Sequence, residues 1–296
     1  MAVIAFVGFG ELAGRLADGV ARSRRHELRA FLRRPATPGS PRDKRLTQAN
    51  VIRCAALSDA ISGADAVLAA VPATAQPETA EQCAPLLAPG ALYIDLASAT
   101  PEAKRDAAER IARRGGSYVD AAVLGTVLTS GFAVPILASG PGANEFQSLM
   151  APEGLNISTL DRPAGDAALV KLLRGIYLKG RDALIVEMML TARRYGVDDT
   201  VAASIDGPGE RVPFPALADR VLRSLAVHAE RRATELEASS ELVRAAGLDP
   251  TFTGAGARTL QAIADLGLAE AFAGERPDDA EAVLQALDAR SGSRAG

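Results

Sequence analysis

The chain has 296 residues, enough for about two domains of ordinary size. Hydrophobic residues make up 48% of it and charged residues 23%, a composition that excludes a disordered chain and allows a sizeable core. With 33 Lys and Arg against 36 Asp and Glu, the net charge of -3 gives no support to nucleic-acid or membrane-surface binding driven by bulk charge.

The number of cysteines and the length of the apolar runs indicate in which cellular compartment the protein is expected. Cys54 and Cys83 are too few for a disulfide framework, and neither they nor His26 and His228 have metal-ligand spacing, so we predict no metal. Residues 1–7 are apolar but lack the length and flanks of a signal peptide, and no apolar run reaches the ~20 residues of a membrane span. We therefore expect a cytoplasmic protein with no membrane partner.

The first half of the chain alternates short apolar runs with helical patterns. Strands are predicted over residues 2–7, 28–32, 51–54, 66–71, 91–96, 117–122 and 135–138. Helices are predicted after the first strand, after Pro72 and after Pro101. Such alternation indicates βαβ units, and hence a parallel sheet with right-handed crossovers.

The pattern changes in the second half. Helical periodicity continues over residues 165–195 and ends at Gly196, and further helices are predicted over 214–246, 254–272 and 277–290. The sequence therefore predicts an α/β Rossmann-type domain, residues 1–162, followed by an all-α domain, residues 163–296, joined by a long helix.

A glycine turn follows the first predicted strand. It has the pattern G-x-G-x-x-A, in which Gly8 permits a tight turn, Gly10 lets the backbone approach a pyrophosphate, and Ala13 allows close packing of helix on strand. The helix that begins here offers unpaired N–H groups to an anion. A turn without a ligand is the alternative. We predict a dinucleotide site whose members here are Gly8, Phe9, Gly10, Glu11 and Leu12.

Two arginines stand where the second predicted strand ends. NAD-binding proteins usually carry Asp or Glu there for the ribose hydroxyls, whereas this chain has Arg33 and Arg34. Guanidinium groups suit a 2′-phosphate through charge-assisted hydrogen bonds. The sequence therefore predicts NADP(H), with a solvated basic turn as the alternative.

Four further segments carry a family resemblance. They are Ala69–Pro72, Ile94–Pro101, Tyr118–Thr126 and Gly165–Lys171. Together with the glycine turn, and in this order, they resemble motifs of the β-hydroxyacid dehydrogenase and 6-phosphogluconate dehydrogenase superfamily over residues 3 to about 180. The resemblance implies that Val71, Pro72 and Ser98 also contact the cofactor, and that Lys171 is the catalytic residue.

The same resemblance implies where a substrate binds. The segment Tyr118–Thr126, which includes Asp120, resembles the substrate loop of the family, and helical spacing puts Arg174 and Gly175 on the face of Lys171. The predicted substrate-binding residues are Ser98, Val123, Leu124, Gly125, Thr126, Lys171, Arg174 and Gly175.

Two departures separate this chain from the better-known members. Leu124-Gly125-Thr126 replaces the Ser-Gly-Gly of the substrate loop, and Gly175 replaces an Asn on the lysine helix. We therefore do not expect ordinary 3-hydroxyisobutyrate or 6-phosphogluconate specificity. The sequence looks more similar to a poorly characterised branch with a distinct helical C-terminal domain of unknown function.

These observations predict an NADP-dependent dehydrogenase or reductase that acts on CH-OH groups. Lys171 is the expected general acid or base for a small, carboxylated hydroxy or oxo substrate. An imine reductase, a decarboxylating enzyme similar to 6-phosphogluconate dehydrogenase, and a noncatalytic NADP-binding sensor are the alternatives. We expect a homodimer formed through the helical domain. His228, Arg231 and Arg232 either close an anionic-substrate pocket or form a solvated helix face.

Overall fold

The computed structural model describes residues 1–207 and 211–291, and the chain divides into two compact units, Met1–Ile176 and Tyr177–Gly296. The division falls inside the helix α8, Asp166–Arg194, which is the long helix expected over residues 165–195. The domain boundary near residue 162 stays a prediction, whereas the fold class, an α/β unit followed by a helical one, is confirmed.

One eight-stranded sheet forms the centre of the first unit. Its order is β3-β2-β1-β4-β5-β6-β7-β8. The strands in chain order are Val3–Val7, Glu27–Phe31, Ile52–Cys54, Ala66–Ala69, Leu92–Asp95, Ser117–Val123, Ile136–Ser139 and Ile157–Thr159. From β3 to β6 the neighbours run parallel, in the order of the Rossmann fold.

The last part of the sheet corrects the prediction that all strands are parallel. β7 pairs antiparallel with β6, and β8, which the sequence did not predict, pairs parallel with β7. Only short helical turns lie between β6 and β7. A connection of that kind reverses the chain, because a parallel crossover needs a longer segment, usually a full helix.

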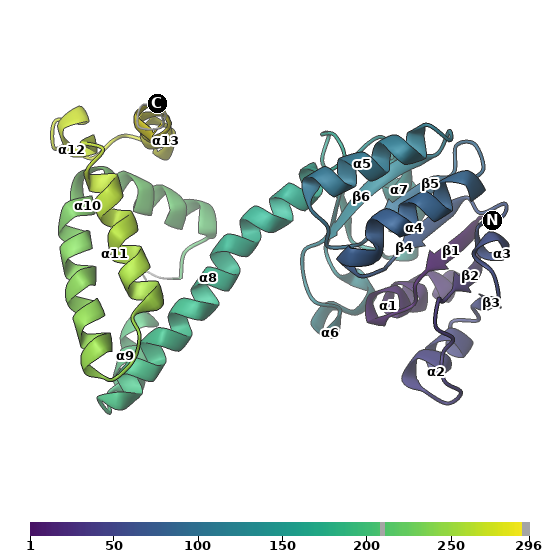
Figure 1. Cartoon of the computed structure of the whole chain (residues 1–296), viewed down its shortest axis with the longest axis horizontal. Coiled ribbons are helices and arrows are strands. Elements are labelled where there is room, and N and C mark those ends of the chain that lie inside the picture. The colour runs from purple at the N-terminus through teal and green to yellow at the C-terminus, as the bar shows by residue number, and fades with distance from the viewer. Residues whose placement is uncertain (208–210, 292–296) are drawn as a thin grey trace. The chain divides into compact units, whose positions relative to one another are not determined.

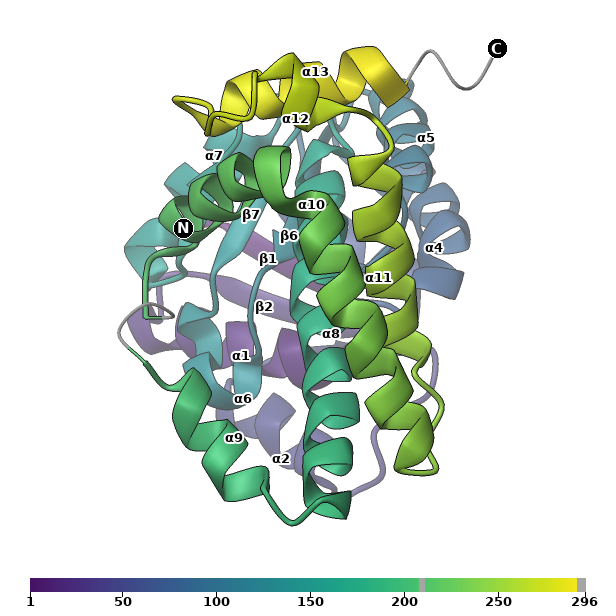
Figure 2. The same ribbon diagram turned by 90° about the vertical axis from the view of Figure 1, so that its left-hand side faces the viewer.

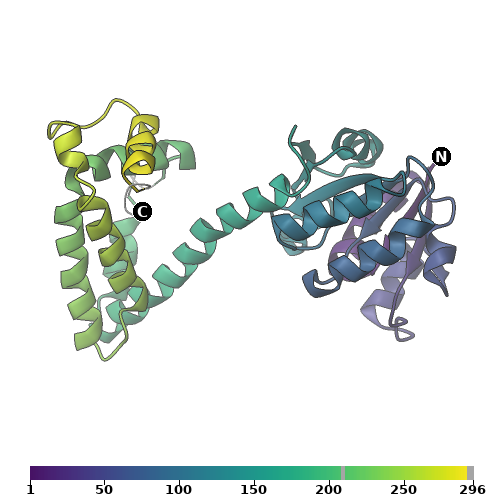
Figure 3. The ribbon, with the colours of Figure 1, turned by 45° about the horizontal axis from the view of Figure 1, so that its top comes forward.

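Two apolar layers cover the two faces of the sheet, because successive residues of a strand point to opposite faces. Ile4 and Phe6 belong to one buried cluster, whereas Ala5 and Val7 belong to the other. The first layer contains buried residues of α1 (Glu11–Val20), α2 (Pro41–Gln48) and α7 (Ala143–Met150). The second contains residues of α3 (Leu57–Ile61), α4 (Gln76–Cys83) and α5 (Pro101–Ala112), and Figures 1 and 3 show α4 and α5 side by side.

The second unit is helical. Its described residues, 177–207 and 211–291, contain helices and no strand. After the end of α8 come α9 (Asp198–Ile205), α10 (Phe214–Ala245), α11 (Thr251–Ala264), α12 (Leu268–Ala271) and α13 (Ala280–Ser291). α10 and α11 run alongside each other (Figure 2), and none of the described helices is both long and apolar enough to cross a membrane.

Three details of the helical unit differ from the sequence prediction. The single helix expected over 254–272 is interrupted at Gly267, whose φ of +65° lies outside the right-handed helical region, so α11 and α12 are separate. α10 covers the predicted range but bends at His228, where φ is -118° and ψ is 15°. The segment that forms α9 was not predicted to be helical.

Glu187 of α8 caps the start of α11. Its carboxylate accepts hydrogen bonds from the backbone N–H groups of Phe252 and Thr253, each at 2.8 Å, and from the Thr253 hydroxyl. Although partial burial alone would raise the pKa of Glu187, these hydrogen bonds hold it below its ordinary value. The carboxylate therefore stabilises the helical unit in its ionised form.

Replacing Glu187 with Ala should destabilise the chain by about 1–2 kcal/mol, the usual cost of losing a helix cap with charged hydrogen bonds. Because the pKa of Glu187 is lower in the folded chain, its contribution is full above the unfolded value of ~4.3 and is lost as the pH falls through the folded value. Urea unfolding of the wild type and of Glu187→Ala from pH 7 to pH 3 measures the difference in their free energies of unfolding. If that difference stays constant with pH, the role of the ionised carboxylate is contradicted.

Candidate functional site

The carboxyl ends of the parallel strands bring most of the predicted site residues to one edge of the sheet. The glycine turn follows β1, Arg33 and Arg34 follow β2, Val71 and Pro72 follow β4, Ser98 follows β5, and residues 123–126 end or follow β6. Ligands of open α/β sheets bind at this edge, where the strand order reverses, here between β1 and β4.

The glycine turn has the geometry that a dinucleotide requires. Gly8 has a φ of +81°, and a Cβ there would lie 2.7 Å from the Ala70 carbonyl oxygen, so no larger residue fits without movement. Gly10 precedes α1, and a Cβ built on it meets no atom of the described chain within 4 Å. Within the described residues, no side chain caps this helix start. The open space beside free N–H groups fits a pyrophosphate.

Basic side chains surround this turn. Arg33 and Arg34 are exposed, and neither forms an ion pair with another described residue. α2 adds two arginines that the sequence analysis missed, since Arg42 and Arg45 line a cavity of about 250 Å³ together with Phe9, Gly10, Glu11 and Pro41. The sequence did indicate this helix, because Ser40 followed by Pro41 is a typical helix start. In the structure the Ser40 hydroxyl accepts a hydrogen bond from the Asp43 N–H.

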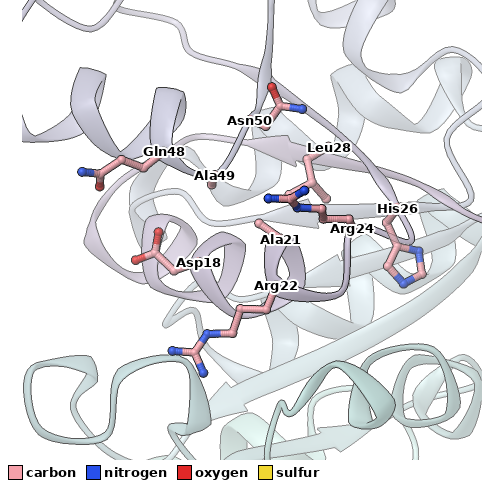
Figure 4. Close-up of a pocket in the computed structure, with 9 residues that line it drawn as sticks. All are labelled: Asp18, Ala21, Arg22, Arg24, His26, Leu28, Gln48, Ala49 and Asn50. Carbon is pink, nitrogen blue, oxygen red and sulfur yellow. The ribbon is translucent and has the colours of Figure 1, made fainter.

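A larger cavity, about 750 Å³, lies at the opposite edge of the sheet (Figure 4). Residues from the carboxyl ends of α1 and α2 and from the start of β2 line it. They are Asp18, Ala21, Arg22, Arg24, His26, Leu28, Gln48, Ala49 and Asn50. The amino end of β2 and the glycine turn are on opposite edges of a parallel sheet, so this cavity is separate from the predicted dinucleotide site.

Ser98 and Lys171 meet although they are far apart in the sequence. The Lys171 Nζ donates a hydrogen bond to the Ser98 Oγ at 2.7 Å, and Lys171 is half-buried while Ser98 is exposed. The structure thus brings together a predicted cofactor residue and the predicted catalytic one. Arg174 and Gly175 follow one turn further along α8, where Arg174 is exposed.

The start of α8 is held by side chains of the sheet. Asp120 of β6 accepts hydrogen bonds from the N–H groups of Gly165 and Ala168, at 3.1 and 2.8 Å, and Ser139 of β7 accepts one from Ala167 at 3.1 Å. Gly165 has a φ of +96°, and a Cβ there would lie 2.7 Å from the Pro101 carbonyl oxygen. These contacts fix the direction of α8, and with it the position of Lys171.

The predicted substrate loop is mostly open to solvent. Val123 is buried at the end of β6 and Leu124 half-buried, whereas Gly125 and Thr126 are exposed. The Thr126 hydroxyl accepts a hydrogen bond from the Leu128 N–H at 3.3 Å and so caps the short helix α6, Val127–Ser130. This hydroxyl therefore has a structural partner within the loop.

The basic face predicted on α10 forms local contacts. Arg231 pairs with Glu235 at 3.8 Å, and Arg232 donates to the Ser224 hydroxyl at 2.8 Å. His228 lies at the bend of the helix, so the regular spacing of this face is interrupted there. Among the described residues, no group of three or more Cys, His, Asp or Glu is placed to hold a metal ion.

Two families match this chain. Residues 3–149 match the NAD binding domain of 6-phosphogluconate dehydrogenase, and residues 192–263 match a domain of unknown function, DUF1932. The first match covers the strands and turns that form the candidate site, from β1 to the end of β7. The second lies in the helical unit.

Two solved structures are similar over almost their whole length. A conserved hypothetical protein from Sinorhizobium meliloti 1021 is 31% identical, with 98% of this chain and 97% of that chain covered and a TM-score of 0.61. The conserved protein MTH1747, of unknown function, is 30% identical over 89% of this chain and 97% of its own, with a TM-score of 0.60. Its structure revealed similarity to 3-hydroxyacid dehydrogenases.

More distant likenesses concern the fold alone or part of a chain. An imine reductase from Aspergillus terreus in complex with NADPH4 and dibenz[c,e]azepine is 18% identical, with 88% of this chain and 94% of that chain covered and a TM-score of 0.67. An uncharacterized 28.5 kDa protein of Methanothermus fervidus is 23% identical over 54% of this chain. The aligned part spans 61% of that curated relative, less than two thirds of its length.

Comparing Gly10→Ala with Gly8→Ala should separate cofactor binding from folding. Gly10→Ala meets only open space in the folded chain, so we expect unchanged stability but at least ~10-fold weaker dinucleotide binding, because the new methyl group occupies the approach of the pyrophosphate. Gly8→Ala should lower both the stability and the affinity for the dinucleotide, since it also strains the turn. Titration of NADPH fluorescence together with thermal unfolding checks this. Wild-type affinity in Gly10→Ala would exclude the glycine turn as the binding site.

Proposed function

The chain belongs to the 6-phosphogluconate dehydrogenase-like family, and we propose that it is an NADP(H)-dependent oxidoreductase acting on a small, carboxylated hydroxy or oxo compound. The observation that carries the proposal is the hydrogen bond from Lys171 to Ser98, 2.7 Å long, at the carboxyl edge of a sheet whose first turn fits a dinucleotide. An amine held at that edge can exchange a proton with a substrate beside the cofactor.

Lys171 performs the proton transfer in this proposal. When bound, the nicotinamide cofactor supplies or accepts the hydride. In the reducing direction the Lys171 ammonium donates its proton to the carbonyl oxygen while the carbonyl carbon receives the hydride, which gives an alcohol. In the oxidising direction the neutral amine takes the hydroxyl proton. Ser98 holds the Lys171 Nζ in place, and the exposed guanidinium of Arg174, one turn further, is available to pair with a substrate carboxylate.

Replacing Lys171 with Ala should lower kcat about 100-fold or more, while the Kd for NADPH stays near the wild-type value, because the side chain acts on the substrate proton. Lys179→Ala is the matched control, since Lys179 is an exposed lysine of the same helix. Oxidation of NADPH at 340 nm with oxo acids, aldehydes and imines measures turnover. A kcat near the wild-type value in Lys171→Ala would remove this residue from the mechanism.

The same panel distinguishes the competing functions. Turnover of imines but not of oxo acids would identify an imine reductase, the activity named for the fold relative from Aspergillus terreus. Release of carbon dioxide during oxidation would identify a decarboxylating enzyme. Tight NADPH binding without turnover of any compound would favour a sensor. The proposal includes a cytoplasmic location, which suits the two free thiols, Cys54 and Cys83.

The preference for NADP(H) rests on the arginines beside the turn. Arg33 and Arg34 follow the second strand, where the ribose of a dinucleotide lies in this fold, and Arg42 lines the cavity beside Gly10. Their guanidinium groups are available to a 2′-phosphate, and neither Arg33 nor Arg34 pairs with a described carboxylate. A phosphate would therefore gain charge-assisted hydrogen bonds without breaking an ion pair.

The double substitution Arg33→Ala/Arg34→Ala should weaken NADPH binding at least ~10-fold and leave NADH binding within about twofold, because only NADPH carries the 2′-phosphate. Arg110→Ala/Arg113→Ala, which removes two other exposed arginines at the carboxyl end of α5, serves as the control. Direct titration of both dinucleotides needs no substrate. An equal loss for NADPH and NADH, or tighter binding of NADH by the wild type, speaks against this preference.

We also propose that the chain forms a homodimer through its helices. Large apolar side chains on α8 are exposed, at 37–72% of their full surface. They are Leu169, Val170, Leu172, Leu173, Ile176, Tyr177, Leu184, Ile185, Val186 and Leu190. So much exposed apolar surface on one helix is typical of an interface. Light scattering at micromolar concentration should give twice the chain mass of 30.6 kDa, and a monomer would contradict the proposal.

A further inference from the structure

Two carboxylates lie next to each other in the interior of the sheet. Asp95 ends β5 and is directly opposite Asp120 in the parallel register of β5 and β6. Both residues are completely buried. Two ionised carboxylates in such a place repel each other and lose their hydration, so the pair requires a positive charge close by.

Lys104 of α5 provides that charge from the same interior. Its side chain is 1% exposed, and its Nζ lies 3.0 Å from the Asp95 Oδ1 and 3.3 Å from the Asp120 Oδ1. The same ammonium donates a hydrogen bond to the Asp95 backbone carbonyl at 2.8 Å. One buried cation therefore joins both strands to α5.

Asp95 organises the segment that carries Ser98. Its Oδ1 accepts a hydrogen bond from the Ala97 N–H at 2.9 Å, directly before Ser98. Its Oδ2 accepts hydrogen bonds from the Gln76 Nε2 and the Tyr118 hydroxyl, both at 2.7 Å. The carboxylate is thus held from several sides, and the backbone that leads to Ser98 turns around it.

Asp120 organises the helix that carries Lys171. Its Oδ2 accepts hydrogen bonds from Gly165 and Ala168, in the first turn of α8, and Lys171 lies one turn beyond Ala168. Lys104 binds both carboxylates, so it connects the Ser98 segment to the start of the Lys171 helix through direct contacts.

We propose that Lys104 is a positioning residue that sets the distance between Lys171 and Ser98, acting through Asp95 and Asp120. The contacts of its ammonium group are with Asp95 and Asp120, and not with Ser98, Lys171 or the glycine turn. The consequence for catalysis rests on the proposed function, whereas the positioning itself does not. If the bridge is removed, the carboxylates and the backbones attached to them shift independently, and the hydrogen bond from Lys171 to Ser98 is lost.

The test compares two variants that share the same change at position 120. Lys104→Met/Asp120→Asn leaves the net charge of the buried cluster as in the wild type. Asp120→Asn alone keeps Lys104 paired with Asp95 and in reach of the amide oxygen at position 120, which can still accept a hydrogen bond from it. The difference between the two variants therefore measures what Lys104 contributes while position 120 is held constant. The readout is the acetylation rate of Lys171 by an N-hydroxysuccinimide ester, measured by mass spectrometry at constant pH. The exposed lysines Lys44 and Lys179 are internal references.

We expect Lys171 to react about fivefold faster in Lys104→Met/Asp120→Asn than in Asp120→Asn, the factor that an ordinary net hydrogen bond corresponds to at 25 °C. Ser98→Ala, which deletes the hydrogen-bond partner, should raise the Lys171 acetylation rate by the same factor relative to the wild type. Adding Ser98→Ala to Lys104→Met/Asp120→Asn should give no further increase in that rate. Lys44 and Lys179 should react at unchanged rates. If both variants are folded and their Lys171 acetylation rates are equal, the proposal is overturned.

A second pair of variants keeps the test usable if the first double variant does not fold. Lys104→Met/Asp95→Asn and Asp95→Asn test the same bridge from the other carboxylate, with circular dichroism as the criterion of folding. If both double variants unfold, Lys104 acts on stability rather than on position, and the proposal is wrong. Where a substrate is turned over, the folded double variants should lower kcat about tenfold with an unchanged Kd for NADPH. Absence of turnover in the wild type would contradict the proposed function and leave the labelling test intact.

Discussion

The hydrogen bonds between Asp120 and the first turn of α8 are the contact on which the candidate site depends. They fix the direction in which a long helix leaves the sheet, and Lys171 lies one turn beyond them. The backbone N–H groups of a helix start are well suited to a carboxylate, because they are unpaired and carry the positive end of the helix dipole. The carboxyl edge of the sheet, with its glycine turn, then lies within reach of one amine from α8.

Much of this arrangement could be predicted from the sequence. The alternation of apolar runs and helical patterns predicted the strands from β1 to β6 and the helices α1, α4 and α5, but not α2 and α3. The G-x-G-x-x-A spacing predicted the glycine turn. Ser98 and Lys171 were connected through the family resemblance, since nothing in their separation along the chain places them side by side. The structure supplies the contact between them, 2.7 Å from Nζ to Oγ.

What could not be predicted depends on contacts between distant segments. Asp120 was interpreted as part of a substrate loop, but its carboxylate caps α8. Lys104 stood in a charged segment typical of a solvated helix. A signal did exist, because the buried residues of α5 are Pro101, Lys104, Ala107 and Ile111, which follow one helical stripe that includes the lysine. The partner of that lysine depended on the register of β5 and β6, which local periodicity does not determine.

A crystal structure of the chain with NADPH tests the central claim most directly, namely that the carboxyl edge of the sheet is the reaction site. We expect the pyrophosphate at Gly10, the 2′-phosphate beside Arg33 and Arg34, and the nicotinamide beside Ser98 and Lys171. NADPH bound in the cavity at the opposite edge of the sheet, or with its nicotinamide away from Lys171, would contradict it.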